Sequence, residues 1–310
     1  MTAPSRRTLL ALGASGALTA CAQSGARPAE PDSRPITIAS APAVQLPGSH
    51  QIDLRHPASA NVWRIFVHVP EQAAPPGGYP VLYTLDGNAT FFLAAQLARN
   101  TANRPAHLRP DPLLVVGIGN PSDDSMDQNA RRRDYTPPPA APDASTGGAD
   151  ILLDFIATQL QPAVASQWRV DAQRQTLFGH SLGGLFTLYA MASRPGLFTR
   201  HAAASPSLWW NDRQVLEQVS TWLDRDTRHR VIAQLRVGSL ERPQPHLDAA
   251  RAARQAERKM NEWVELLARR IQAARATHVV DFQELAGLDH GGVLAPALID
   301  AVALAQREAI

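Results

Sequence analysis

Ser181 lies in the segment TLFGHSLGGLF, residues 176–186, with a glycine two positions away on each side. The pattern Gly-x-Ser-x-Gly is typical of a sharp strand-to-helix turn that exposes a nucleophilic serine. TLF predicts the strand and LGGLFTLYAMAS predicts the helix. We expect Gly179 and Gly183 to be required, because a Cβ at either position would clash in the turn. The backbone N–H of Leu182 would face the charge that develops on a bound carbonyl. The alternative interpretation is an ordinary glycine-rich turn.

A serine hydroxyl needs a base that removes its proton, and in this arrangement the order along the chain is serine, acid, histidine. His290 is the predicted base, because it lies in AGLDHGGV beyond a strand end and two glycines follow it. A histidine in a surface loop is the alternative. The other downstream histidines fall at strand starts or in charged segments: His201, His229, His246 and His278.

The acid that orients the histidine should follow the preceding strand, in RVGSLERPQPHLD. Glu241 is the first choice because it lies two residues past Ser239, close to the predicted strand end. Asp248 is the second choice, and a Ser–His dyad without an acid is the third. Asp289 is a poor candidate, because the side chains of adjacent residues point apart.

The second oxyanion donor should come from the loop after the strand PVLYTLDG, residues 80–87. Gly87 and Asn88 can each present a backbone N–H there. An ordinary turn is the alternative interpretation of DGN.

Short β-rich runs alternate with helical ones from about residue 50, which predicts an α/β domain of the doubly wound type, with a mostly parallel central sheet and helices on both faces. Continuous apolar runs indicate buried parallel strands, whereas residues 61–70 alternate like an early antiparallel strand. The predicted strands are 61–70, 80–87, 112–119, 175–178, 201–207, 231–239 and 278–285. Residues 150–168 predict a helix that Pro162 bends or splits. A charged helix over 246–276 either rests on the body or caps the pocket as a lid.

The composition fits one large domain, residues 48–310. The chain has 310 residues, of which 45% are hydrophobic and 19% charged, with a formal net charge of +2. Its arginines form no continuous basic stripe, so we expect no nucleic-acid partner. The single cysteine excludes an intramolecular disulfide and a cysteine-built zinc site, and we predict no metal or organic cofactor.

The N-terminus predicts export. Arg6 and Arg7 precede an apolar run, Leu9 to Ala20, which is too short for a transmembrane helix and ends at Cys21. The twin arginine resembles a Tat signal, and LTAC resembles a lipobox at which the cysteine is acylated. We therefore predict a signal peptide over 1–21, a flexible linker over 22–47, and a periplasmic lipoprotein whose only membrane contact is the lipid on Cys21.

Several segments together resemble the siderophore esterases of the α/β-hydrolase superfamily, of the enterobactin and salmochelin type. They are YTLDGNATF, RRRDYTPP, FGHSLGGLF, SPSLWW, VGSLE and DHGG, in that order over residues 50–305. The group also includes feruloyl esterases and S-formylglutathione hydrolases. The resemblance implies an α/β-hydrolase fold with Ser181 as nucleophile and His290 as base, and it leaves the acid open.

The same resemblance implies a substrate-binding role for the segment RRRDYTPP. The family pattern falls on Arg131, Asp134, Tyr135, Thr136 and Pro137, and the family's arginine lies beside the site and helps to hold the anionic ferric catecholate. A solvated basic run is the alternative interpretation, above all for the neighbouring arginines 132 and 133.

Two tryptophans are the other predicted substrate-binding residues. Trp209 and Trp210 follow the run HAAAS and could supply aromatic walls for catechol rings. Plain packing under a loop is the alternative interpretation.

The sequence thus predicts a serine carboxylic-ester hydrolase that opens a trilactone catecholate siderophore through an acyl-enzyme, with iron arriving as part of the substrate. One alternative is an esterase for feruloyl, acetyl or simple acyl groups. The other is a tethered lipoprotein that binds its ligand without turning it over.

Overall fold

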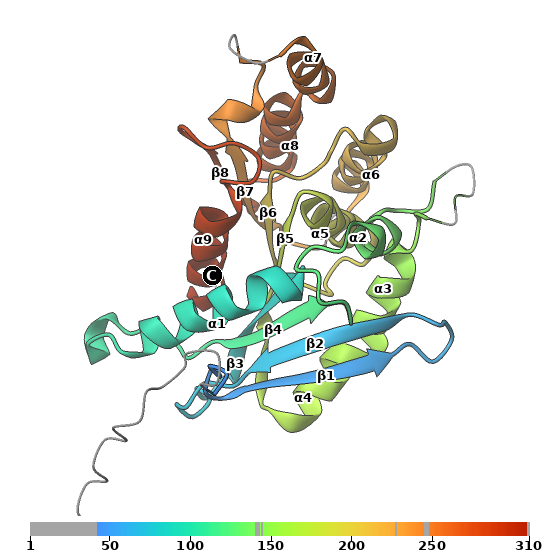
Figure 1. Ribbon diagram of the computed structural model, residues 1–310. Coiled ribbons are helices and arrows are strands. Elements are labelled where there is room, and N and C mark those ends of the chain that lie inside the picture. The colour runs from blue at the N-terminus through green and yellow to red at the C-terminus, as the bar shows by residue number, and fades with distance from the viewer. Residues whose placement is uncertain (1–41, 140–142, 144, 227, 245–247, 309–310) are drawn as a thin grey trace, which may run out of the picture. The chain divides into compact units, whose positions relative to one another are not determined.

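Eight strands of the described residues form one sheet in the computed structural model (Figure 1). Their order across the sheet is β1-β2-β4-β3-β5-β6-β7-β8. Strand β2 runs antiparallel to β1 and β4, and the other neighbouring pairs are parallel, which confirms the predicted mostly parallel sheet. The strands are β1 Ser49–Arg55, β2 Val62–His68, β3 Tyr79–Leu85, β4 Leu114–Gly119, β5 Val170–His180, β6 Arg200–Ala204, β7 Ile232–Gly238 and β8 Val279–Leu285.

The structure describes residues 42–139, 143, 145–226, 228–244 and 248–308. The predicted signal peptide with Cys21 and most of the predicted linker lie outside these residues. In the part of the chain described, no helix combines the length and the apolar character that a membrane span requires.

The predicted strands are present, with shifted ends. β3 and β4 are buried at every position, as expected for apolar runs covered on both faces. The run 80–87 ends two residues early as a strand, because Asp86 adopts a left-handed conformation and Gly87 begins a helix. β1 was not predicted. Its sequence, SHQIDLR, is polar, and most of its residues are exposed at the sheet edge.

Helices cover both faces of the sheet, as predicted (Figure 1). α1 and α9 pack together on one face, and the connected helices α2, α3, α5, α6 and α8 lie on the other. The helices are α1 Gly87–Ala102, α2 Gln128–Tyr135, α3 Ala149–Phe155, α4 Gln161–Gln167, α5 Leu182–Ser193, α6 Trp210–Arg225, α7 Ala249–Arg258, α8 Met260–Ala274 and α9 Leu294–Gln306.

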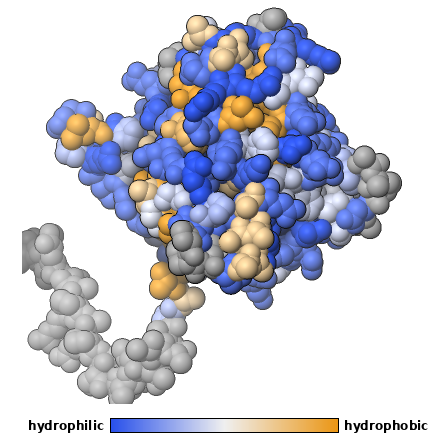
Figure 2. Space-filling view, turned by 90° about the horizontal axis from the view of Figure 1, so that it is seen from above, coloured by the Kyte–Doolittle hydropathy of each residue, from blue (hydrophilic) through white to orange (hydrophobic). Residues whose placement is uncertain are grey.

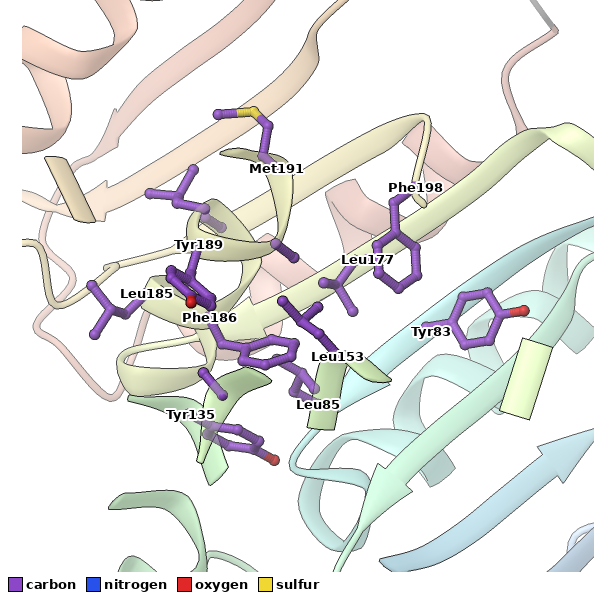
Figure 3. Packing of buried hydrophobic residues seen from close by; sticks show 14 of the residues in the cluster. Tyr83, Leu85, Tyr135, Leu153, Leu177, Leu185, Phe186, Tyr189, Met191 and Phe198 are labelled. Atoms are coloured by element: carbon purple, nitrogen blue, oxygen red, sulfur yellow. The ribbon is translucent and has the colours of Figure 1, made fainter. Parts of the chain in front are cut away.

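The larger hydrophobic cluster surrounds α5, whose residues Leu182 to Met191 are all buried. Figure 3 shows Phe186 of this helix among side chains from β3, β5, α2 and α3. Each large apolar side chain that is removed from water in this way contributes about 1.5–3 kcal/mol to folding. The helix that follows Ser181 is therefore held on all sides, and its N-terminus has a fixed position.

The two long predicted helices are both interrupted. A π-helical turn, Ile156–Leu160, separates α3 from α4 directly before Pro162, as expected where proline removes a backbone hydrogen bond. The predicted helix over 246–276 divides into α7 and α8 at Lys259, whose φ of 46° is left-handed.

Candidate active site

Ser181 stands at the turn between β5 and α5 in a conformation that few residues with a side chain adopt, with φ 59° and ψ −116°. A Cβ on Gly179 would lie 2.2 Å from the carbonyl oxygen of Gly183, so only glycine fits there. The expectation for Gly183 itself was wrong. A Cβ at that position would have its nearest contacts at 3.5 Å, an ordinary van der Waals distance, because it would point toward β3.

The structure brings Ser181, His290 and Glu241 into one hydrogen-bonded chain. Ser181 Oγ lies 3.0 Å from His290 Nε2, and His290 Nδ1 lies 2.6 Å from Glu241 Oε2. The carboxylate accepts, so Nδ1 carries the hydrogen and Nε2 is free to take the serine proton. Of the acids considered, Glu241 rather than Asp248 reaches His290. Asp289 is exposed and accepts a hydrogen bond from the Gly292 backbone instead.

Glu241 is 6% exposed, and its second oxygen is also bound. Oε1 accepts from Ser205 Oγ at 2.5 Å and from the Gly238 N–H at 2.8 Å. Burial raises the pKa of Glu241, but the hydrogen bond and charge of His290 and the hydrogen bonds from Ser205 and Gly238 outweigh it, so this pKa lies below its ordinary value. The carboxylate therefore stays ionised and can stabilise an imidazolium.

Two backbone segments offer N–H groups beside the serine. Leu182 begins α5, and Gly87 and Asn88 begin α1. None of their N–H groups has an acceptor among the described residues. The turn before α1 lies directly against the serine turn. This is shown by Asp86 Oδ2, which would lie 3.5 Å from a Cβ placed on Gly183. The assignment of Leu182, Gly87 and Asn88 to an oxyanion hole stays a prediction.

The side chain of Asn88 has a separate task. Its amide group donates to the carbonyls of Asn120 and Ser122 and accepts from the Asn120 N–H, so it fixes the loop after β4. Any contribution of Asn88 to an oxyanion hole would therefore come from its backbone.

The sequence also belongs to a known family. The family model for esterases, whose description is "Putative esterase", matches residues 60–292. The chain belongs to this esterase family. The ferri-bacillibactin esterase BesA of Bacillus subtilis is 30% identical over 83% of this chain and 89% of that protein. The siderophore enterobactin esterase of Emericella nidulans is 36% identical over 70% and 78%, respectively. The siderophore hydrolase EstB from Aspergillus nidulans superposes with a TM-score of 0.77, at 31% identity over 86% of this chain and 98% of that one.

The protein is therefore a carboxylic-ester hydrolase with the α/β-hydrolase fold. Two further residues of this esterase, which were not predicted from the sequence, lie against the triad. Ser205, with φ 42°, orients Glu241, and Ser207 lies with its Oγ 3.4 Å from that of Ser181. The signal for both was SPS, which forms the last three residues of the predicted strand 201–207 and directly follows the observed strand β6.

His180, which precedes the nucleophile, holds the catalytic histidine from behind. Its Nε2 donates to the backbone carbonyl of His290 at 2.7 Å, and the two rings lie 4.8 Å apart. Burial, followed by the nearby His290 and Arg131, lowers the pKa of His180 to about 4. The esterase thus keeps a neutral histidine beside its base.

The structure places Arg131 inside the esterase, not on the open surface of the site. Only 6% of the residue is exposed. Its guanidinium donates to Asp86 Oδ1 at 2.8 Å and to the His180 carbonyl at 3.1 Å. These contacts tie the serine turn to the turn before α1. The geometry gives no support to a substrate contact by Arg131. Its side chain instead stabilises the turn that carries Ser181.

Trp209 and Trp210 are partly buried after the end of β6, with their ring centroids 6.0 Å apart.

A pocket of about 200 Å³ opens beside the triad of the esterase, with Glu241, His290 and residues of α7 in its wall. The described residues contain no group of three or more histidine, cysteine, aspartate or glutamate side chains placed to hold a metal ion.

Proposed function

We propose that this esterase hydrolyses the ester bonds of a trilactone catecholate siderophore through an acyl-enzyme. The observation that carries the chemistry is the assembled chain from Ser181 Oγ through both nitrogens of His290 to Glu241. The substrate class follows from the relatives, three of which are named for the hydrolysis of bacillibactin, enterobactin or another siderophore.

The reaction would proceed in two halves. Ser181 Oγ attacks an ester carbonyl while His290 Nε2 takes its proton, and the imidazolium is stabilised by Glu241. Backbone N–H groups at the start of α5 and α1 would face the oxyanion. His290 then returns the proton to the leaving alkoxide, which opens the ring. Water repeats the sequence on the acyl-enzyme and releases a free carboxylic acid and the serine.

Product analysis tests this proposal. The detergent-solubilised full-length protein is incubated with ferric enterobactin, iron-free enterobactin, methyl ferulate and p-nitrophenyl butyrate, beside the Ser181→Ala variant. We expect ring opening with kcat/KM at least about a hundredfold above that of the simple esters, and a loss of kcat by about five orders of magnitude in Ser181→Ala.

Other outcomes would replace the proposal. Fast turnover of the simple esters with an intact trilactone would make the protein a general acyl or feruloyl esterase. Tight binding of the siderophore with no hydrolysis of any ester would make it a binding lipoprotein. The complete triad favours turnover over mere binding.

We also propose that the chain is exported and anchored through an acylated Cys21. The proposal rests on the order of twin arginine, apolar run and LTAC at the N-terminus. We expect Cys21→Ala to lose radiolabelled palmitate and to move from the membrane fraction to the soluble fraction. Membrane association that persists without the label would refute the anchor.

A further inference from the structure

Helix α7 places two arginines in the wall of a pocket that also contains the catalytic histidine. Arg254 and Arg258 are one helical turn apart, so they share a face of α7. Between them, Gln255 Nε2 donates to the Leu240 carbonyl at 3.0 Å, which holds α7 against the segment that carries Glu241. The pocket is lined by Leu240, Glu241, Arg254, Gln255, Arg258, Met260, Asp289 and His290.

The charges of these two arginines are not neutralised within the described residues. Neither forms an ion pair there, and both side chains are exposed. Of the pocket's two carboxylates, Glu241 is buried and hydrogen-bonded to His290, whereas Asp289 is exposed and keeps its charge while it accepts from the Gly292 N–H. An anion beside α7 would meet two available guanidinium groups, which bind oxygen anions through paired N–H donors.

An aromatic surface continues from this pair. The guanidinium carbon of Arg258 lies 4.4 Å from the ring centroid of Trp209, and Trp210 follows with Arg132 above it at 5.2 Å. Each guanidinium lies over an indole ring, so the surface is cationic and aromatic together, with the two ring planes inclined at 55°. Figure 2 views the molecule from the end at which Figure 1 places α7, and hydrophilic residues dominate that face.

Resting on the proposed function, we infer that Arg254, Arg258 and Trp209 bind the iron–catecholate part of the substrate and make this esterase prefer the ferric form. Three catecholates around Fe(III) carry three net negative charges on a complex with aromatic edges. The iron-free form keeps most of its catechol protons near neutral pH and offers little charge. An exposed arginine pair beside an indole ring would bind the charged ferric form more tightly than the iron-free form. A neutral acyl ester carries no charge for these arginines to bind.

The double variant Arg254→Gln/Arg258→Gln tests the inference by steady-state kinetics at pH 7. We expect kcat/KM for ferric enterobactin to fall about 30-fold, mainly through KM, because two charge-assisted contacts are lost. For iron-free enterobactin the loss should stay below about threefold, and p-nitrophenyl butyrate should be unaffected, since neither carries the charge that the arginines bind. Arg258→Lys keeps the charge but loses the planar stack, and we expect an intermediate loss.

Arg225→Gln/Arg228→Gln is the matched control, because it removes the same charge from exposed positions that precede the start of β7, whereas the triad residues follow the carboxyl ends of the strands. We expect it to leave the preference for the ferric form intact. Tryptophan fluorescence quenching by ferric enterobactin in a Ser181→Ala background measures binding without turnover, and the α7 substitutions should weaken this binding.

Each other outcome overturns a defined claim. If the wild-type protein leaves both trilactones intact, the proposed function fails. If it cleaves ferric enterobactin and the α7 double variant retains its kcat/KM within about threefold, the function stands and the arginine pair is not the recognition site. Equal losses on all three substrates, or an equal loss in the control variant, would also refute recognition by these arginines.

Discussion

Arg131 and Asp86 form an ion pair in which both side chains are almost completely buried, with 7% and 3% exposed. Burial raises the pKa of Asp86 even though Arg131 lowers it, so desolvation is the larger effect on this carboxyl group. A buried pair of this kind contributes little net stability, but the removal of one partner leaves an uncompensated charge in the interior. The pair is therefore best tested by stability rather than by substrate affinity.

Arg131→Met should lower the free energy of unfolding by about 3–5 kcal/mol, because Asp86 then loses its counter-charge. Urea denaturation measures this change. The double variant Asp86→Asn/Arg131→Met should recover part of the loss, since asparagine tolerates the left-handed φ of 54° at position 86 and carries no charge. Arg132→Met, on the exposed side of the same helix, is the control and should change stability little. Unchanged stability in Arg131→Met together with a raised KM for the ferric substrate would restore the substrate-binding role.

Single residues differ in how far their roles can be predicted from sequence. Ser181, His290 and Glu241 could be predicted, because each follows a strand end and the order of the three along the chain is fixed by the fold. Ser205 and His180 could not, since their roles depend on which carboxylate and which carbonyl the folded chain brings to them. Arg131 lies where the motif predicts, near the serine, but no local pattern reveals that its side chain points inward to Asp86.

At the scale of the element, the serine turn depends on one of its two glycines. The carbonyl of Gly183 passes so close to Gly179 that a Cβ has no room at 179, whereas the atoms nearest to a Cβ at 183 would belong to Leu85 and Asp86, at 3.5 Å. The familiar motif therefore contains one position required by sterics and one that is not. A sequence pattern treats both positions alike, because it contains no information about which backbone segment approaches which.

Gly179→Ala and Gly183→Ala should consequently differ strongly. We expect Gly179→Ala to destabilise the protein by about 3 kcal/mol or more and to abolish ester hydrolysis, because the backbone of α5 must move away from β5. Gly183→Ala should change the free energy of unfolding by less than about 1 kcal/mol, since alanine is also the better helix former. Thermal denaturation and p-nitrophenyl butyrate turnover measure both effects. Equal losses in the two variants would show that the asymmetry is wrong.

The strands and helices themselves could be predicted where burial on both faces produces an uninterrupted apolar run, as in β3 and β4. Edge strand β1 could not, because its exposed residues carry no such signal. The division of the last charged segment into α7 and α8 was also hidden, since it depends on a left-handed lysine, which sequence does not favour. This division sets α7 apart as a separate short helix beside the catalytic histidine.

At the scale of the whole molecule, two buried histidines, His201 and His180, link stability to pH. Burial lowers the pKa of His201 to about 4, and burial together with the neighbouring His290 and Arg131 lowers that of His180 to about 4. An unfolded histidine takes up a proton below about pH 6.5, whereas these two remain neutral in the folded state until about pH 4. Between these limits the unfolded state binds more protons, so stability rises with pH and falls on acidification.

His201→Gln should therefore reduce the pH dependence of stability as well as stability itself. Between pH 7 and pH 5, each buried neutral histidine should lower the free energy of unfolding of the wild type by about 2 kcal/mol. His201→Gln should therefore lose about 2 kcal/mol less than the wild type over the same pH interval. The low pKa of Glu241 acts only at more acidic pH and does not disturb this window. Urea denaturation at the two pH values gives both differences, with exposed His107→Gln as the control. If His201→Gln and the wild type lose the same free energy between pH 7 and pH 5, His201 is protonated inside the folded protein.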